Sequence, residues 1–445
     1  MIKRTFLVRA LALIGLFVPA LYADSALDEG AASARMDTSP KPIEAILGPL
    51  MGDQLISGYH LSVYKNHQQI LNLNAGFADD ARKIEPSEDV LYAIASMTKP
   101  IVSLATLILA DRGVLNLDDA VQTFIPEFAD LMVVEDGDYD NPAKALSRDI
   151  TIHDLLTHTS GLTYSQDITG REEIAQLYAE LDILSIDGMF RSRLGNLDAH
   201  IQELVQLPLV AQPGALFVYS VSIDVLGRVL EIATDKPLDQ LLDELVLKPL
   251  GMKDTGFRVP AANVNRLSQM YSPRVATYPI PGVYRRYEPY ANLPKGQKNF
   301  GQSNETYLSG GAGLISSAQD YAKFLNFLSQ GTTSSGQSLL SAEMLGQMFV
   351  NQLPQALGSN GLVYNFGPMA GGTGFGYGLG ISLKTGGDPE NQSDHDYYFW
   401  AGAANTGFWI DPEHNLIGVL MIQHLPTQYD RVAELVEAAR QLYSD

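Results

Sequence analysis

Apolar residues along the chain follow two different spacings, which predict strands at both ends and helices between them. Residues 58–76 alternate between apolar and polar positions around a polar turn at Lys65–His67, a pattern typical of a β-hairpin. Four short apolar runs between residues 376 and 423, separated by turn residues, predict a strand meander. Because both ends supply strands, we expect one sheet completed by both ends of the chain, with a helical insertion between them.

Helical spacing of apolar side chains recurs through the middle of the chain and at its end. A Thr151-x-x-Asp154 sequence has the form of a capping box and predicts a helix start. The helical spacing predicts helices at 40–53, 96–112, 223–233, 238–246, 316–331 and 431–443.

The N-terminal residues have the pattern of a secretory signal. Three basic residues within the first nine precede an apolar run and the small residue Ala23. We therefore expect cleavage near Ala23 and a periplasmic or secreted bacterial protein. An uncleaved membrane anchor is the alternative, but the apolar run is short for a membrane span.

The predicted elements divide the rest of the chain into three parts. Residues 24–38 are small and polar and are expected to form a flexible leader. An α/β subdomain is expected from residues 39–112 together with 365–445, and a mostly helical subdomain from 113–364. A chain of 445 residues is long enough for two or three domains.

Composition narrows the range of partners. The chain has no cysteine, which excludes disulfides and a lipid anchor on an N-terminal cysteine, and its formal net charge is −21. A strongly negative surface disfavours nucleic acid, anionic lipid and anionic substrates. The acidic residues could equally serve only to keep an exported protein soluble. We expect no nucleic-acid partner and no stable membrane anchor, and the sequence leaves the oligomeric state open.

A Ser-x-x-Lys sequence occurs twice, and geometry separates the two copies. Ser62 and Lys65 lie in a predicted strand, where residues three apart point to opposite faces. Ser96 and Lys99 lie at the start of a predicted helix, where residues three apart are neighbours. The helix N-terminus favours a developing negative charge, and a buried lysine can lose its proton and act as a base. Ser96 is therefore the candidate nucleophile and Lys99 its proton acceptor.

Three tyrosines are candidates for a second proton-transfer group. Tyr139 stands among carboxylates in a polar loop, which would raise the pKa of its phenol. Tyr290 stands in an aromatic-rich loop and could line a pocket without reacting. Tyr219 follows a Pro213-Gly214 turn and directly precedes a predicted helix, so a rigid frame would hold it. Tyr219 is the preferred candidate.

Other polar residues give weaker indications of a functional site. His153 and His158 are five apart, off one helix face and without a third ligand, so we interpret them as structural and predict no metal and no cofactor. The absence of a Gly-x-Ser-x-Gly sequence disfavours an ordinary α/β-hydrolase. Asp224 is expected to cap or brace the helix after Tyr219, with a polar role near the site as the alternative.

Long stretches of the sequence resemble the serine β-lactamase-like hydrolases, the superfamily of class C β-lactamases and D-alanyl-D-alanine peptidases. The likeness is greatest to the family VIII carboxylesterases, and it extends from about Gly58 to Gln423. The stretches that carry it include ASMTKPIVSLATLIL, TIHDLLTHTSGLTY, QPGALFVYSVSIDVLGRVLE, SGGAGLISSAQDYAKFL and FWAGAANTGFWIDPEHNLIGVLMIQ.

The resemblance implies an antiparallel sheet flanked by helices, with a mostly helical inserted subdomain, in the α/β class of the α+β type. It also implies an acyl-enzyme on Ser96, with Lys99 and Tyr219 sharing the proton. The backbone N–H groups of Ser96 and Ala403 would form the oxyanion hole. Trp400-Ala401-Gly402 would occupy the place of the Lys-Thr-Gly motif of the lactamases.

Two departures from the lactamase pattern bear on the substrate. Val221 replaces an asparagine that could bind an acylamido group, and Trp400 replaces a lysine that would hold a carboxylate. Small residues at 401–403 would keep the oxyanion strand accessible, so Val221, Trp400 and Gly402 are expected to contact substrate. A literal Lys-Thr-Gly does occur at Lys384, but it precedes a turn one strand earlier, and we interpret it as coincidental.

The sequence therefore predicts a serine carboxylesterase that acts on neutral, small-molecule esters. The alternative is a β-lactamase or a D-alanyl-D-alanine carboxypeptidase or transacylase of the same fold. A non-catalytic binding protein on this scaffold is disfavoured because serine, lysine and tyrosine are all present.

Overall fold

The computed structural model describes most of the chain after residue 39. The described residues are 40–134, 143–164, 172–180, 195–274, 287–291, 293, 297, 299–302, 307–353, 375–385 and 395–444. The predicted signal sequence and leader lie outside them, as do Tyr139 and the proposed subdomain boundary at 364/365. The division into two subdomains therefore remains a prediction.

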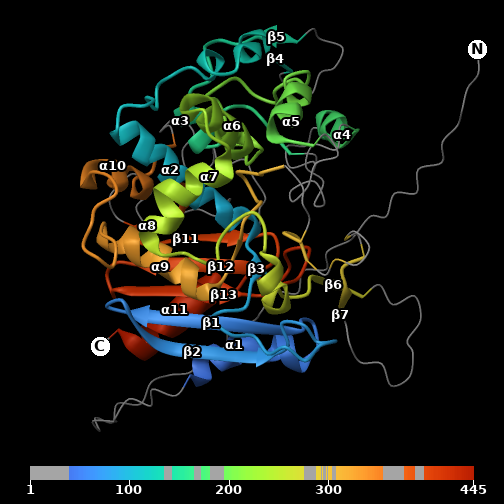
Figure 1. Cartoon of the computed structure of the whole chain (residues 1–445), viewed down its shortest axis with the longest axis vertical. Coiled ribbons are helices and arrows are strands. Elements are labelled where there is room, and N and C mark those ends of the chain that lie inside the picture. Colours follow the sequence, from blue (N-terminus) through green and yellow to red (C-terminus); the bar gives the residue numbers. More distant parts are fainter. Residues whose placement is uncertain are drawn as a thin grey trace, which may run out of the picture. The chain divides into compact units, whose positions relative to one another are not determined.

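A seven-stranded antiparallel sheet lies in the lower half of the view in Figure 1. Its order is β2-β1-β13-β12-β11-β10-β9, and β1 pairs with β13 so that His60 lies opposite Met421. Both ends of the chain therefore complete one sheet, as predicted. The strands are β1 (Gly58–Lys65), β2 (Gln68–Gly76), β9 (Phe375–Tyr377), β10 (Ser382–Thr385), β11 (His395–Gly402), β12 (Thr406–Asp411) and β13 (Leu416–Met421).

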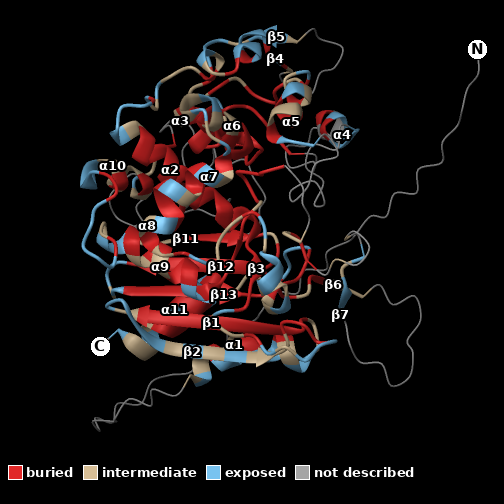
Figure 2. Ribbon diagram, in the orientation of Figure 1, coloured by how far each residue is buried: buried red, intermediate tan, exposed pale blue. Residues whose placement is uncertain are grey.

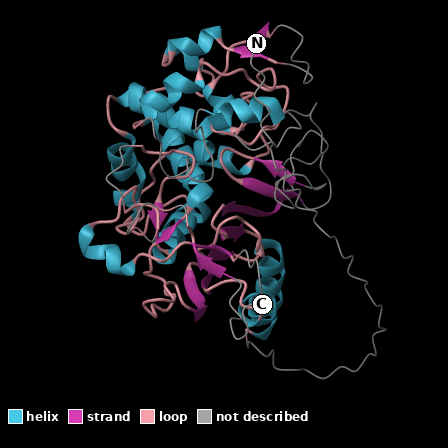
Figure 3. Ribbon diagram, turned by 90° about the vertical axis from the view of Figure 1, so that its right-hand side faces the viewer, coloured by secondary structure: helices cyan, strands magenta, loops and turns pink. Residues whose placement is uncertain are grey.

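Helices cover both faces of the sheet (Figures 1 and 3). Helices α1 (Lys41–Gly52) and α11 (Val432–Tyr443) share an apolar core with Trp409, whereas α2 (Thr98–Asp111) and α9 (Ala318–Gln330) share the other core with Phe408. Neighbouring residues of a strand point to opposite faces, so Phe408 and Trp409 belong to different cores. All six residues of β12 are buried for this reason, and α2 is buried over most of its length (Figure 2).

Above the sheet in the view of Figure 1 lies the helical part of the chain. The predicted capping box is present, because Thr151 Oγ1 accepts a hydrogen bond from Asp154 N and Asp154 accepts one from Thr151 N. The predicted helix 238–246 continues as a π-helical turn, Asp243–Leu247. The helices here are α3 (Ile152–Leu156), α4 (Glu172–Glu180), α5 (Leu197–Leu204), α6 (Ser222–Thr234), α7 (Leu238–Leu242), α8 (Lys248–Leu250) and α10 (Ala342–Gly346).

Short strand pairs connect these layers. They are β3 (Tyr92–Ala93) with β8 (Ile315–Ser316), β4 (Met132–Val133) with β5 (Lys144–Ala145), and β6 (Tyr271–Pro273) with β7 (Tyr287–Pro289). Within the described parts of the chain, no helix is both long and apolar enough to cross a membrane.

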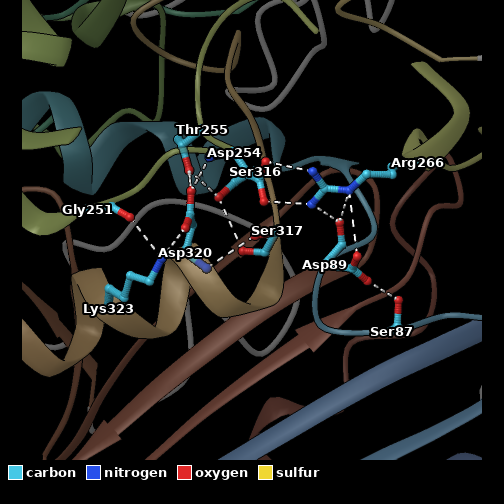
Figure 4. A network of polar contacts seen from close by, with 10 residues as sticks. All are labelled: Ser87, Asp89, Gly251, Asp254, Thr255, Arg266, Ser316, Ser317, Asp320 and Lys323. Atoms are coloured by element: carbon cyan, nitrogen blue, oxygen red, sulfur yellow. Dashed lines mark hydrogen bonds and ion pairs between the residues drawn. The ribbon is translucent and has the colours of Figure 1, made fainter. Parts of the chain in front are cut away.

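An ion-pair network fixes the segment that leads to Ser96 (Figure 4). Both Nη atoms of Arg266 donate to the carboxylate of Asp254, at 2.8 and 2.6 Å, and Arg266 Nε donates to the carbonyl oxygen of Asp89. Asp254 N in turn donates to Asp320 in the first turn of α9. Bidentate arginine–carboxylate pairs of this kind are strong and directional. The network therefore ties the chain just before β3 to α9.

Candidate active site

Ser96 lies in a short 3₁₀ turn, Ala95–Met97, that leads into α2. The preceding residue, Ala95, has a φ of +46°, in the left-handed region that non-glycine residues rarely adopt. Such strain is stored where the surrounding structure over-determines the backbone. Here β3 holds the turn from one side, since Ile94 N donates to Leu314 O at 3.1 Å. These contacts therefore hold the turn that carries Ser96 in place at the start of α2.

Lys99 lies one turn along α2 and reaches back to Ser96. Its Nζ is 3.3 Å from Ser96 Oγ and donates at 3.0 Å to the hydroxyl of Tyr164 and at 2.9 Å to the carbonyl oxygen of Gly311. The side chain is fully buried. Burial lowers the pKa of Lys99 to about 7, although the nearby carboxylate of Asp224 acts in the opposite direction. A substantial fraction is therefore neutral near pH 7 and can accept a proton.

Tyr219, the preferred candidate for the second proton-transfer group, lies beside Lys99. Lys99 Nζ lies 4.5 Å from the centre of the Tyr219 ring. Burial raises the pKa of Tyr219, while interactions of its hydroxyl with Ser96, Tyr164 and Trp400 lower it. Burial has the larger effect, so the phenol is protonated at neutral pH and can pass a proton on rather than hold a permanent negative charge.

Tyr164 is a member of the cluster that the sequence interpretation missed. Its hydroxyl accepts the hydrogen bond from Lys99, and its ring lies 5.3 Å from that of Tyr219. Burial raises its pKa well above the ordinary value. The available signal was its place at the end of the matching stretch TIHDLLTHTSGLTY.

The end of strand β11, directly before Ala403, packs on the residues that precede Ser96. A Cβ atom on Gly402 would lie 2.3 Å from both the Ile94 carbonyl oxygen and Thr406 Oγ1, so this strand end packs directly on the turn before Ser96. Ala403 follows, and its carbonyl oxygen accepts a hydrogen bond from Thr427 Oγ1 at 2.8 Å. Close packing against Ile94, rather than open access for substrate, explains why residue 402 is glycine.

Gly402→Ala is expected to lower kcat by about tenfold or more, with a small change in KM, since the added methyl group must push the strand end away from Ile94. Steady-state kinetics on an ester would measure this. The matched control is Gly48→Ala, because a Cβ atom there meets nothing within 4 Å. Unchanged kcat in Gly402→Ala would contradict the close packing.

Trp400 and Val221 differ in their surroundings. The Trp400 ring meets Tyr219 edge-on at 5.5 Å and Tyr377 at 5.4 Å, so it forms an aromatic wall with these two rings. Val221 stands at the N-cap of α6 and is fully buried. Trp400 therefore contacts Tyr219, whereas Val221 packs in the core, and substrate contact by either side chain stays a prediction.

The rejected alternatives lie elsewhere. Ser62 Oγ interacts with His60, and Lys65 Nζ donates to the carbonyl oxygen of Tyr443. Lys384 pairs across β10 and β11 with Tyr397, three residues before Trp400, and therefore lies about 10 Å along the strand. Lys384 lies in β10, one strand before β11, and is not beside Trp400.

The two histidines singled out in the sequence are apart. His153 interacts with Gln352, and His158 accepts a hydrogen bond from Ser220 N while its ring packs at 4.7 Å from Tyr219. Among the residues that the structure describes, no group of His, Cys, Asp and Glu has the arrangement of a metal site. His158 thus supports the frame that holds Tyr219.

The sheet, its helical layers and the serine–lysine pair at the start of α2 define a serine hydrolase of the β-lactamase-like fold. The chain belongs to the β-lactamase family, whose sequence model, described as Beta-lactamase, matches residues 43–441. The resemblance drawn from the sequence motifs is therefore confirmed.

Known relatives include an esterase. Protein Rv1367c of Mycobacterium tuberculosis is 32% identical over 385 residues, which cover 84% of this chain and 87% of that protein. Esterase EstB of Burkholderia gladioli is 34% identical over 312 residues, which cover 67% of this chain and 70% of that protein. The family therefore includes proteins named for ester hydrolysis.

Solved structures show the same fold. EstCE1, described as a hydrolase with promiscuous acyltransferase activity, has a TM-score of 0.71 and 24% identity, and the match covers 91% of this chain and 98% of EstCE1. Simvastatin synthase (LovD) from Aspergillus terreus has a TM-score of 0.68 and 21% identity, over 92% and 98% of the two chains.

Proposed function

We propose that the protein is a serine carboxylesterase that cleaves neutral carboxylic esters through an acyl-enzyme on Ser96. The observation that carries the proposal is the contact of Lys99 Nζ with Ser96 Oγ at 3.3 Å, in a fully buried setting that lowers the pKa of the lysine to about 7. A base of this kind matches a reaction that runs near neutral pH.

In the first half-reaction, Ser96 Oγ attacks the ester carbonyl carbon and loses its proton to neutral Lys99. Tyr219, whose hydroxyl interacts with Ser96, relays a proton to the alcohol oxygen as the C–O bond breaks. The backbone N–H groups of Ser96 and Ala403 hold the negative oxygen of the tetrahedral intermediate. Each such donor contributes about 3–4 kcal/mol to lowering the barrier. Water then attacks the acyl-enzyme by the reverse proton path and releases the acid.

Neutral esters are favoured over anionic amides because of Trp400. Its indole stands in the aromatic wall, edge-on to Tyr219. By the resemblance, it replaces the lysine with which a lactamase holds a substrate carboxylate. An indole offers an apolar face and a single N–H donor, but no positive charge. Val221, where the lactamase pattern has asparagine, supplies no side-chain amide to bind an acylamido group. The names of EstB and of the lovastatin esterase of Penicillium rubens, 27% identical over 372 residues, support ester hydrolysis.

A substrate panel tests the proposal against its main alternative. We expect kcat/KM for p-nitrophenyl butyrate to exceed that for nitrocefin and for a D-Ala-D-Ala peptide by about a hundredfold, a difference of about 3 kcal/mol in transition-state stabilisation. A fluorophosphonate should label Ser96, as seen by peptide mass spectrometry. Faster turnover of nitrocefin or of the peptide would replace the esterase assignment by the lactamase or peptidase alternative.

A further inference from the structure

A buried carboxylate stands behind Lys99 and has no place in the mechanism above. Asp224 lies in the first turn of α6 and is 1% exposed. Its Oδ1 accepts hydrogen bonds from Ser309 Oγ at 2.6 Å, from the Tyr307 hydroxyl at 3.3 Å and from Gly311 N at 3.3 Å. Every one of these partners belongs to the segment that precedes β8, so Asp224 holds that segment and not its own helix.

The N-terminus of α6 confirms that Asp224 is not a helix cap. The N-cap is Val221, and no side chain makes a capping hydrogen bond there. The expectation that Asp224 caps its helix is therefore wrong, because the carboxylate points across to a different segment. The role of the Asp224 carboxylate therefore depends on the residues that the segment Ser309–Gly311 contacts.

Gly311 connects Asp224 to Lys99. Its N–H donates to Asp224, and its carbonyl oxygen accepts the hydrogen bond from Lys99 Nζ at 2.9 Å. A Cβ atom at this residue would lie 2.5 Å from Asp224 Oδ2 and 3.5 Å from Lys99 Nζ, so the residue is wedged between carboxylate and amine. At Gly310 a Cβ atom would lie 2.5 Å from the Ile223 carbonyl oxygen. Two consecutive glycines thus allow the carboxylate and the lysine to approach a single backbone segment.

We propose that Asp224 is a positioning residue that acts through Gly311 to hold Lys99 at Ser96 and to stabilise its protonated form after proton transfer. The proposal rests on the assignment of Lys99 as the base of the proposed esterase. Lys99 accepts a positive charge in each half-reaction, and a carboxylate behind it favours that charge in the transition state. Asp224 would therefore supply part of the driving force for proton removal from Ser96.

The charged and titratable surroundings of Lys99 support this role. Asp224 raises the pKa of Lys99 against the larger effect of burial. The other groups that face the lysine or the carboxylate are neutral at neutral pH, since burial raises the pKa values of the tyrosines and lowers that of the histidine. They are Tyr164, Tyr219, Tyr307 and His158.

Asp224→Asn tests the proposal through the pH dependence of kcat/KM for p-nitrophenyl butyrate. The wild-type rate should fall on the acidic side as Lys99 becomes protonated. Without the carboxylate the lysine loses its proton more easily, so we expect this acidic limb to move down by about one pH unit. We also expect kcat on the plateau to fall about tenfold, because the protonated lysine is less stabilised.

The matched control is Asp411→Asn, another aspartate that is 1% exposed, whose partners Arg440 and His414 lie away from Lys99. Its acidic limb should stay where the wild type has it. An unmoved limb in Asp224→Asn, or an equal shift in Asp411→Asn, would overturn the proposal. Should Asp224→Asn fail to fold, Gly311→Ala replaces it, since the added methyl group separates carboxylate and amine and should move the limb in the same direction.

Labelling of Ser96 by a fluorophosphonate distinguishes this proposal from the proposed function. Its rate follows the protonation of Lys99 without any ester substrate, so the same downward shift is expected in Asp224→Asn. If Ser96 labels in the wild type with an acidic limb that Asp224→Asn leaves unmoved, the esterase assignment stands and the role of Asp224 fails. If Ser96 of the wild-type protein is not labelled, the assignments of Ser96 as nucleophile and Lys99 as base are wrong, and the proposed function fails.

Discussion

Ser96→Ala is expected to lower kcat/KM for ester hydrolysis by about four orders of magnitude or more, because no acyl-enzyme can form without the hydroxyl. The remaining rate would come from the backbone donors and from substrate binding alone. Steady-state assays with p-nitrophenyl butyrate measure this loss of kcat/KM directly. The variant should fold as the wild type does, because the substitution removes one hydroxyl from a preformed turn.

The second Ser-x-x-Lys sequence offers a matched control. Ser62→Ala also removes one hydroxyl from a buried serine, and its hydrogen bond to His60 is lost. Its kcat/KM should stay within about twofold of the wild type, since β1 carries no part of the site. Full activity in Ser96→Ala, or a comparable loss in Ser62→Ala, would show that the nucleophile has been misassigned.

Lys99→Met is expected to lower kcat/KM by about a thousandfold, because methionine fills the same buried space and cannot accept a proton. The wild-type acidic limb near pH 7, which follows from the lowered pKa of Lys99, should also disappear. A pH series of kcat/KM for the wild type and the variant measures both effects. Retention of the limb in Lys99→Met would assign it to a different group.

The same variant should be more stable than the wild type, which provides a readout independent of catalysis. The folded-state pKa of Lys99 is about 7, against 10.5 for the ordinary side chain, so between these values the unfolded chain binds a proton that the folded chain lacks. The free energy of unfolding contributed by this lysine therefore rises with pH across that window. Lys99→Met should raise Tm by about 2 °C or more at a pH of about 6 and by less at a pH of about 9.

The sequence predicted the sheet and most helix bounds because these depend on local spacing. Residues three apart at a helix start identify Ser96 and Lys99, and alternation identifies the hairpin β1–β2. The assignment of roles to these residues remains a prediction that the experiments above test.

Local spacing could not predict the residues that reach the site from distant segments of the chain. Tyr164 contacts Lys99 across 65 positions of the chain, and Gly311 does so across 212. Nothing in the residues around Asp224 shows that its carboxylate points away from α6. The two glycines after Ser309 were the available signal, because consecutive glycines often mark a close approach of backbone to another group.

The pairing of β1 with β13 has a consequence for the order in which the protein becomes active. His60 and Met421, which lie opposite each other, are about 360 residues apart in the chain. Such distant pairing makes folding slow, because the cost of closing a long loop comes before the contacts that offset it. Ser96 is synthesised long before Ala403, its expected oxyanion partner. If the proposed function holds, a nascent chain carries the nucleophile without the means to stabilise its transition state, and hydrolysis would begin only when the last strands have joined the sheet.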